Sequence, residues 1–307
     1  MLDQILVMFF SRTTSPAGSA TLLVGRGGEA LRASFPGAAC DARPAPAPYP
    51  LEGVAELVLA DPALPRAAAM AWLAQADQAG AAVWMPAELL PELARAGIRP
   101  RMIDGTPFYR FQGLKTDGDR GAAVRLAPLA ALLALPAALP LLALLALRVW
   151  LTDGRPVVFA QKRIGYRGRR FTIYKFRTMG HARARQARQV TDAGERLRRH
   201  GLDELPQIFN LLSGSMALIG PRPLPVDEHP RGNGLGAWMS ATRERVLPGL
   251  TGLYQVCPGR RGLGLAEMCV LDAYWIHNRS PRLDAWILLR TFVAMFRGWG
   301  RASAASR

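Results

Sequence analysis

The stretch RRHGLDELPQIFNLLSGSMALIGPRP, residues 198–223, decides how the rest of this chain is interpreted. Two adjacent carboxylates, Asp203 and Glu204, follow a basic pair and precede a short, mostly apolar run. A turn of small residues comes next, and the stretch closes on G-P-R-P at 220–223. Pro206 suits the first turn of a helix, because its missing N–H would be unpaired there anyway. The two carboxylates are therefore expected at or just before a helix start.

A helix start exposes unpaired N–H groups and the positive end of the helix dipole, and both favour phosphate. One acid could attack a phosphorus atom while its neighbour holds a divalent cation, which shields the phosphate charge from the incoming carboxylate. In the alternative interpretation Asp203 caps the helix and Glu204 decorates its first turn. An isolated D-E-L-P favours this alternative, and the surrounding sequence reverses the preference.

Charge divides the chain into two different parts. The 307 residues carry a net charge of +16. Residues 1–120 hold 11 basic and 12 acidic residues, whereas residues 121–307 hold 28 and 11. The second part is therefore expected to meet something anionic, such as nucleic acid, a phospholipid surface or a nucleotide substrate.

Cysteine and histidine usage argues against a metal-binding or disulfide framework. The three cysteines, Cys40, Cys257 and Cys269, are widely spaced and odd in number, which suits a reducing compartment. The four histidines have no ligand spacing. The apolar start MLDQILVMFF is short and lacks a basic flank, so it is a poor signal peptide.

The N-terminal part alternates strand and helix patterns. The segment ATLLVGRGG at 20–28 reads as a strand entering a glycine-rich turn, as in nucleotide-binding βα units, although its glycine spacing matches G-x-G-x-x-G poorly. Further strands are expected at 54–59, 81–84 and 107–112, and helices at 65–79 and 86–96. The alternation predicts a small parallel α/β domain, interpreted as a fold relic that binds no dinucleotide.

Residues 126–147 carry no charge over 22 positions, and a basic residue flanks each end. A straight helix of that length would rise roughly 33 Å, enough to span a bilayer. Pro128, Pro136 and Pro140 would kink it. Two interpretations stay open on these residues: one tilted spanning helix, or a bent re-entrant hairpin with both ends on the cytoplasmic side, which the basic flanks fit.

Residues 155–179, RPVVFAQKRIGYRGRRFTIYKFRTM, predict a β-hairpin with strands at 157–161 and 171–176. The hairpin is dense in Arg, Lys and aromatic residues, as nucleic-acid-binding surfaces are. Its place directly after a membrane segment favours anionic headgroups instead. Lysine occurs only at 115, 162 and 175, so Lys162 and Lys175 stand out in a chain that otherwise uses Arg.

Three later segments have helical patterns. Residues 181–199 predict a basic helix, on the membrane surface or solvated. Residues 263–278 predict a helix with Asp272 in its second half, which either faces a site or is a satisfied core acid. Residues 281–298 predict an amphipathic helix that packs on the core or lies in the membrane interface.

Several motifs in order resemble the bacterial sugar transferases, the monotopic polyprenol-phosphate phosphoglycosyl transferases. They are P-V-V-F-A-Q-K-R-I-G, Y-K-F-R-T-M, L-D-E-L-P-Q-I-F-N-L-L, G-P-R-P and P-G-L-T-G-L-Y-Q-V, within about residues 122–300. The N-terminal region is similar, more loosely, to the Rossmann-like domain of larger members. The resemblance implies a Rossmann-like α/β domain at 1–118, a re-entrant membrane helix hairpin at 119–152, and an α+β membrane-associated catalytic domain at 153–307.

The resemblance also implies a reaction. Asp203 would attack the β-phosphate of a UDP-sugar and release UMP, and undecaprenyl phosphate would then take the sugar phosphate from the aspartate. Glu204 would hold Mg²⁺, and Asp272 would complete the catalytic set. Pro140 matches the proline that bends the family's re-entrant helix, which favours the hairpin. The expected substrate-binding residues are Lys175, Arg177, Arg199, Pro221, Arg222, Pro223, Gln255 and Arg260.

The family's setting is the cytoplasmic face of the bacterial inner membrane, at the initiating step of exopolysaccharide, O-antigen or glycoconjugate synthesis. A homodimer is expected, and nucleic acid is not an expected partner. This chain departs from the family at Leu139 before Pro140, at His200-Gly201 before the carboxylate dyad Asp203-Glu204, and at Cys257-Pro258, where an Asn is usual. The alternative function is a non-catalytic membrane scaffold of an assembly complex. A nucleic-acid-binding membrane protein is a third, which would require salt-sensitive binding to an oligonucleotide.

Overall fold

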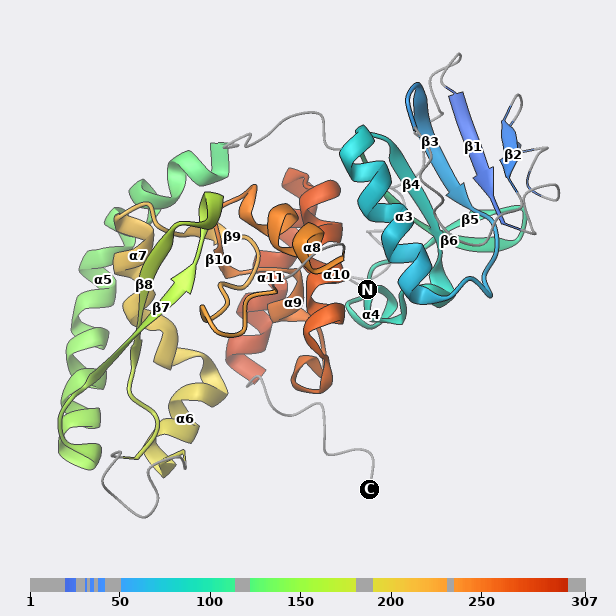
Figure 1. Cartoon of the computed structure of the whole chain (residues 1–307). Coiled ribbons are helices and arrows are strands. Elements are labelled where there is room, and N and C mark those ends of the chain that lie inside the picture. Colours follow the sequence, from blue (N-terminus) through green and yellow to red (C-terminus); the bar gives the residue numbers. More distant parts are fainter. Residues whose placement is uncertain are drawn as a thin grey trace, which may run out of the picture. The chain divides into compact units, whose positions relative to one another are not determined.

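The computed structural model describes residues 20–25, 31, 34–35, 38–41, 51–113, 122–180, 190–230 and 235–297 (Figure 1). The chain divides into two compact units, and each is described by itself. The first contains residues 1–89 and 101–113, and the second contains residues 90–100 and 114–307. Residues 90–100, which the sequence assigned to the N-terminal domain, thus belong to the second unit.

The first unit is built on a six-stranded sheet with strand order β2-β1-β3-β4-β6-β5. The first four strands are parallel, and β6 runs antiparallel to both β4 and β5. Helix α3 (Arg66–Ala79) follows β3. The strands are β1 Ala20–Val24, β2 Ala39–Asp41, β3 Val54–Leu59, β4 Ala82–Pro86, β5 Arg101–Ile103 and β6 Thr106–Phe111.

The mixed α/β character of this unit is confirmed, but its sheet is not parallel throughout as predicted, because β6 runs antiparallel to β4. The short strands β2 and β5 were not predicted. The helix predicted at 86–96 divides into a 3₁₀ turn, η3 (Ala87–Leu89), and helix α4 (Pro91–Arg95). The cause is Pro91, which forces Leu90 out of the helical region to φ −131° and ψ 55°. Residues 26–28 of the glycine-rich turn lie outside the described residues, so the interpretation of this unit as a fold relic that binds no dinucleotide stays a prediction.

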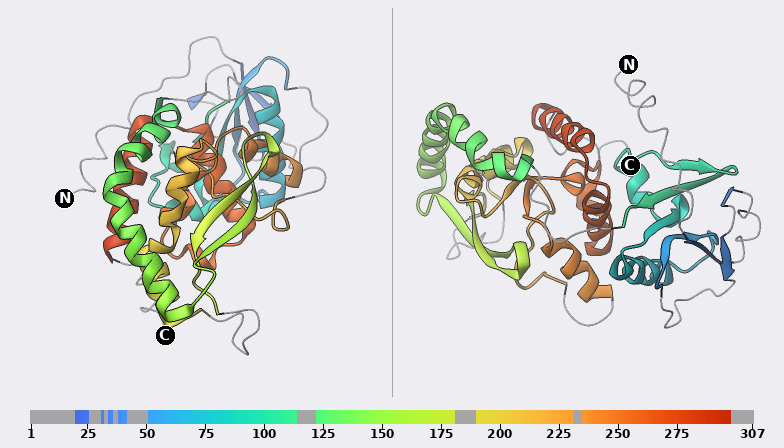
Figure 2. Two further views of the ribbon diagram at one scale, coloured as in Figure 1. Left: turned by 90° about the vertical axis from the view of Figure 1, so that its left-hand side faces the viewer. Right: turned by 90° about the horizontal axis from the view of Figure 1, so that it is seen from above.

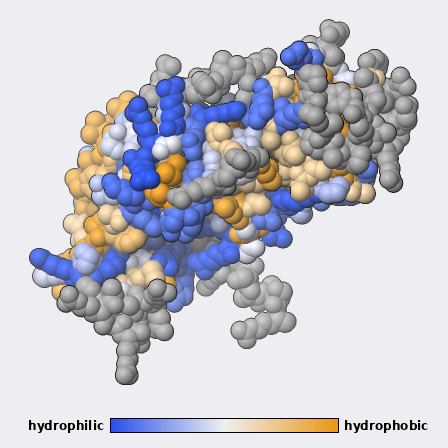
Figure 3. Space-filling view, in the orientation of Figure 1, coloured by the Kyte–Doolittle hydropathy of each residue, from blue (hydrophilic) through white to orange (hydrophobic). Residues whose placement is uncertain are grey.

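The second unit begins with helix α5 (Ala122–Asp153), which runs through 32 residues with Pro128, Pro136 and Pro140 inside it. Figures 1 and 2 show its first turns at an angle to the rest. The predicted hairpin is not confirmed, because the chain forms one bent helix. Within the described residues, one helical segment, 127–153, is long and apolar enough to cross a membrane. Figure 3 shows hydrophobic residues gathered along the edge where α5 lies.

The predicted β-hairpin is confirmed as β7 (Val158–Ile164) paired antiparallel with β8 (Arg170–Phe176). A second, two-stranded sheet pairs β9 (Ala217–Ile219) and β10 (Gly249–Thr251) in parallel, and it was not predicted. Neither was helix α8. Of the stretch 181–199, residues 181–189 lie outside the described residues. The helices are α6 Asp192–His200, α7 Ile208–Leu212, α8 Leu235–Glu244, α9 Leu253–Val256, α10 Leu265–His277 and α11 Pro281–Arg297.

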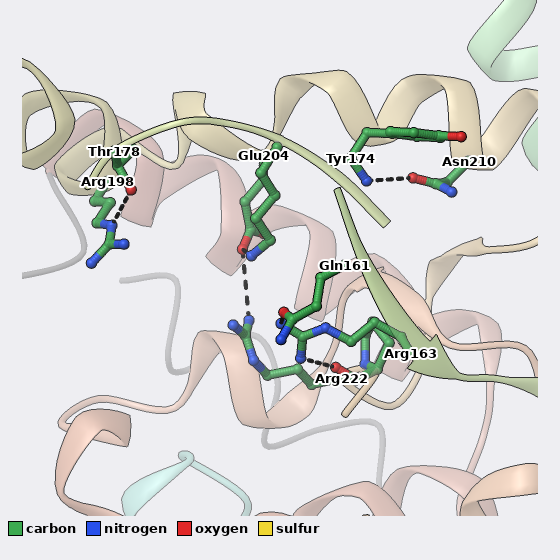
Figure 4. A network of polar contacts seen from close by, with 10 residues as sticks. Gln161, Arg163, Tyr174, Thr178, Arg198, Glu204, Asn210 and Arg222 are labelled. Carbon is green, nitrogen blue, oxygen red and sulfur yellow. Dashed lines mark hydrogen bonds and ion pairs between the residues drawn. The ribbon is translucent and has the colours of Figure 1, made fainter. Parts of the chain in front are cut away.

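Two sets of contacts fix the short elements around the DELP stretch. Buried Asn210 of α7 donates its amide to the Thr172 carbonyl at 2.7 Å and accepts the Tyr174 N–H at 3.3 Å, which joins α7 to β8 (Figure 4). An apolar cluster of Leu145, Val149, Phe176 and Leu197 packs α5, β8 and α6 together. The residues between α6 and α7 are therefore held on both sides.

The G-P-R-P segment lies close to the P-G-L-T-G segment. Gly249 donates its N–H to the Pro221 carbonyl at 2.9 Å, and Gly220 donates to the Thr251 carbonyl at 2.9 Å. A Cβ on Gly249 would stand 2.1 Å from the Gly220 nitrogen, so only glycine permits this approach. The close approach of Gly220 and Gly249 thereby fixes the position of Arg222.

Candidate active site

Asp203 and Glu204 lie in a 3₁₀ helix, η5 (Leu202–Gln207), that leads directly into α7. Gly201 adopts the left-handed conformation, with φ 68°, and ends α6 just before the pair. The pair is thus at a helical start, as predicted, although the first turn is 3₁₀. The Glu204 N–H already donates to the Gly201 carbonyl at 3.2 Å, so this amide is not free for a phosphate.

Both carboxylates line a cavity of about 1370 Å³ in the second unit. Basic side chains from separate elements surround them on the cavity wall. These side chains come from the β7–β8 hairpin and the residue that follows it, from α6, from the G-P-R-P loop and from the turn after α9. They are Arg163, Lys175, Arg177, Arg198, Arg222, Arg260 and Arg261. This cavity therefore favours a ligand that carries several negative charges.

Glu204 is the carboxylate that faces the cations most directly. Its Oε1 lies 2.5 Å from Lys175 Nζ and 3.7 Å from Arg222 Nη1, and Figure 4 shows the pairing with Arg222. Burial acts to raise the pKa of Glu204, but Lys175 and Arg222 outweigh it and hold the pKa below its ordinary value. Burial in turn lowers the pKa of Lys175. Glu204 is therefore an ionised oxygen donor at neutral pH.

Asp203 has the opposite electrostatic balance. Its side chain is buried, and this burial, followed by the charge of Glu204, raises its pKa above the ordinary value. Lys175 and Arg198 oppose the rise. The two neighbouring acids are thus differentiated: Glu204 is the stronger acid, and Asp203 is the more basic and therefore the more nucleophilic carboxylate.

Asp272 lies behind the cavity wall rather than in it. Its carboxylate is 1% exposed, and its Oδ2 lies 3.2 Å from Arg243 Nε. Burial raises the pKa of Asp272 to about 7, against the charges of Arg243 and Arg222. Arg243 Nη2 donates to the Arg222 carbonyl. The pair therefore holds the backbone that carries Arg222, which favours a positioning role for Asp272 over the predicted catalytic role.

The structure assigns the arginines of α6 differently from the sequence prediction. Arg199 is exposed and pairs with Glu195 at 3.5 Å, one turn away on the same helix. Arg198 lines the cavity instead, and its Nε donates to Thr178 Oγ1 at 2.7 Å (Figure 4). Adjacent helical residues point about 100° apart, which is why only one of them reaches the cavity.

Arg177 borders the cavity, but its guanidinium is used locally. Its Nη2 donates to the carbonyls of Asp153 and Gly154, the latter at 3.0 Å, where α5 ends. Unpaired carbonyls at a helix C-terminus attract such a cation. Arg177 therefore holds the C-terminal end of α5, and phosphate binding by it stays a prediction.

Of the remaining predicted residues, Gln255 and Arg260 line the cavity, and Pro221 and Pro223 do not. Gln255 is buried and lines the cavity, and Arg260 Nη1 donates to its carbonyl oxygen. Burial, then the charge of Arg222, lowers the pKa of Arg260 to about 10. Pro221 and Pro223 flank Arg222. The Pro221 carbonyl accepts from the Gly249 N–H of β10, and the Pro223 carbonyl accepts from Arg163 of β7.

Sequence reasoning missed Arg163. This residue lines the cavity, donates Nη1 to the Pro223 carbonyl at 3.0 Å, and donates Nη2 to Gln161 Oε1 at 2.6 Å (Figure 4). Burial, followed by Arg222, lowers its pKa to about 10. Lys162, which the composition singled out, is exposed on the opposite face of β7. The period of two along a strand separates these neighbours, and Gln161 and Arg163 share one face.

The oxygen donors of the dyad can be compared with those that Mg²⁺ requires. In the part of the chain that the structure describes, no three His, Cys, Asp or Glu side chains gather as metal ligands. Mg²⁺, however, commonly takes only one or two carboxylates and completes its shell with substrate phosphates and water. Ionised Glu204 in a cavity that favours phosphate fits that requirement. The Glu204 carboxylate would then interact with both the cation and Lys175.

Comparison with known proteins gives a consistent family. The family model described as "Bacterial sugar transferase" matches residues 123–298. The "Uncharacterized sugar transferase EpsL" of Bacillus subtilis is 39% identical over 149 residues, which are 47% of this chain and 71% of that protein. The "Exopolysaccharide production protein ExoY" of Sinorhizobium fredii is 33% identical over 192 residues, which are 54% of this chain and 82% of that protein.

A longer relative carries a more specific name. The "Undecaprenyl-phosphate glucose phosphotransferase" of Komagataeibacter xylinus is 38% identical over 177 residues. These residues are 53% of this chain and only 33% of that protein. The match therefore covers about half of this chain and a third of that relative.

Proposed function

Because this chain belongs to the bacterial sugar transferase family, we propose that it moves a sugar 1-phosphate from a UDP-sugar to undecaprenyl phosphate. The names of its relatives indicate a polyprenyl-phosphate sugar-1-phosphate transferase. One observation carries the proposal: Asp203 and Glu204 lie side by side in a cation-rich cavity whose wall includes the apolar helix α5. A charged sugar donor and a lipid acceptor could both reach such a place.

The proposed reaction has two displacements at one phosphorus atom. A carboxylate oxygen of Asp203 attacks the β-phosphorus of the UDP-sugar, and the bond to the bridging oxygen breaks. UMP leaves with that electron pair, and a sugar phosphate stays esterified to Asp203. An oxygen of undecaprenyl phosphate then attacks the same phosphorus. The Asp203 carboxylate leaves, and the product is a polyprenyl diphosphate sugar. The raised pKa of Asp203 supports its assignment as the nucleophile.

The cations around the dyad have a clear part in this proposal. Lys175 and Arg222 already bracket Glu204. Arg163 and Arg260 line the same cavity. Charge that develops on the transferred phosphate would be stabilised by these preorganised donors, which need no rearrangement at the moment of reaction. Glu204 would hold Mg²⁺, whose contribution when bound is to neutralise phosphate charge.

The setting proposed for this reaction is the cytoplasmic face of the bacterial inner membrane, at the start of exopolysaccharide or a related glycoconjugate. The apolar face of α5 supports membrane attachment. We propose that α5 is re-entrant, because Arg125 and Arg148 place a basic residue at each end of its uncharged run. A Rossmann-like identity for the first unit and a homodimer stay predictions of the resemblance.

A screen of UDP-sugars tests the reaction. The full chain in detergent is mixed with each UDP-sugar, undecaprenyl phosphate and Mg²⁺, and free UMP is measured. We expect UMP from at least one sugar, and matching formation of a lipid diphosphate sugar. Absence of UMP with every donor, from a folded preparation, would contradict the proposed function and favour a non-catalytic scaffold.

A further inference from the structure

The cavity beside the dyad has two sides of opposite chemistry. Around the carboxylates its wall is formed by Lys175, Arg222 and Arg260, which suit a phosphate. A nucleotide sugar offers little that an extended apolar wall would recognise. Yet much of the remaining lining is apolar and comes from α5, β9 and α11, namely Ala130, Ala134, Leu218, Leu288, Phe292 and Met295.

Helix α11 is fixed relative to the dyad by polar contacts on both sides. Thr291 Oγ1 lies 2.6 Å from Thr251 Oγ1 of β10. The carbonyl of Met295 lies 2.9 Å from His200 Nδ1, at the end of α6. Because only Gly201 and Leu202 separate His200 from Asp203, these contacts hold the apolar wall next to the carboxylate pair.

The apolar wall is incompletely covered by the protein itself. Phe292 is 60% exposed and Leu288 is 37% exposed although both border the cavity. On the opposite wall Ala130 and Ala134 are exposed small residues of a helix whose other exposed residues include many leucines. Binding of an apolar ligand that removes such side chains from water lowers the free energy of the complex.

We infer that this apolar lining binds the first isoprene units of the acceptor lipid, with the lipid phosphate at the cationic end beside Asp203. The inference rests on the proposed function, from which the acceptor is taken. A molecule with one phosphate head and a long apolar chain matches both sides of the cavity, whereas the nucleotide sugar matches only the charged side. Helix α11 then selects the acceptor, and the dyad performs the transfer.

A matched pair of leucines tests this assignment. Leu288 and Leu289 are neighbours on α11, 37% and 48% exposed, and only Leu288 lines the cavity. For undecaprenyl phosphate we expect Leu288→Ala to raise KM several-fold and Phe292→Ala to raise it roughly tenfold, since part of a large apolar contact is lost in each. Leu289→Ala should stay within about twofold of the parent.

Two further measurements separate this inference from the proposed function. Single-turnover UMP release without acceptor reports the donor step, and a lipid role predicts that Leu288→Ala impairs acceptor use far more than this release. Direct binding of undecaprenyl phosphate without donor decides the inference even if no UDP-sugar releases UMP. Equal dissociation constants for Leu288→Ala and Leu289→Ala would overturn it, and a weaker Leu288→Ala alone would support it.

Discussion

At the scale of single residues, the site depends on which of two similar neighbours reaches the cavity. Sequence spacing identified the carboxylate pair and Lys175, because adjacent acids and a rare lysine are visible in composition. It selected Arg199 where the structure uses Arg198, and it drew attention to Lys162 where the structure uses Arg163. Which of two neighbouring side chains faces the cavity depends on how the helix or strand is rotated about its own axis. An error of one residue in that assignment exchanges the inward and outward positions.

Arg198 and Arg199 provide a direct comparison of neighbouring charges. Arg198→Gln removes a cation that acts on Asp203, and we expect a loss of roughly 10- to 100-fold in kcat/KM, as for a charge-assisted contact at a reacting group. Arg199→Gln, on the exposed side of α6, should remain within about twofold of the parent. Equal losses in the two variants would contradict the assignment of Arg198 to the cavity.

The pKa directions predict how activity depends on pH. Asp203 must be ionised to attack, so activity falls as the pH drops through its pKa, which burial and Glu204 raise above the ordinary aspartate value. Lys175 opposes this rise, so Lys175→Met should move the acid limb of kcat/KM to higher pH. A limb that stays in place, or that moves to lower pH, would remove Asp203 from the role of titrating nucleophile.

At the scale of elements, local patterns predicted β3, α3, the β7–β8 hairpin and α11 because each satisfies its own periodicity. They did not predict β2, β5, β9 or α8. Strands β2, β5 and β9 have only three residues each, too few for a periodicity, and become strands by pairing with β1, β6 and β10 respectively. The 3₁₀ turn that holds the dyad likewise follows from Gly201 and from packing between β8, α6 and α7.

The buried pair between α8 and α10 gives the prediction at this scale. Arg243→Met leaves Asp272 buried without its partner and should lower the free energy of unfolding by about 3–5 kcal/mol. The double variant Arg243→Met with Asp272→Leu should regain much of that stability. It should not regain activity, because the Arg222 carbonyl has lost its donor. Thermal unfolding and UMP release distinguish these effects, and an active double variant would contradict the positioning role.

At the scale of the whole molecule, the path of α5 decides on which side of the membrane each unit lies. Glu52 precedes α5 and Arg167 follows it, and both are exposed. In a Cys40→Ser background, Glu52→Cys and Arg167→Cys can be labelled separately with an impermeant thiol reagent. Cys257 and Cys269 are buried, which raises their pKa to about 11 and slows their reaction.

The re-entrant path predicts that neither engineered cysteine is labelled in intact spheroplasts and that both are labelled after permeabilisation. A spanning helix predicts labelling of one of the two in intact spheroplasts. The three prolines inside α5 bend it without ending it, so this choice depends on the surrounding bilayer.

The central claim is that a sugar phosphate is carried on Asp203. The most direct measurement is mass spectrometry of the protein quenched in acid after mixing with its UDP-sugar and Mg²⁺ in the absence of acceptor. We expect a mass increase of one sugar phosphate, located on the peptide that contains Asp203 and absent from Asp203→Asn. An active preparation that shows no such adduct, or an Asp203→Asn variant that turns over at the parental rate, would contradict it.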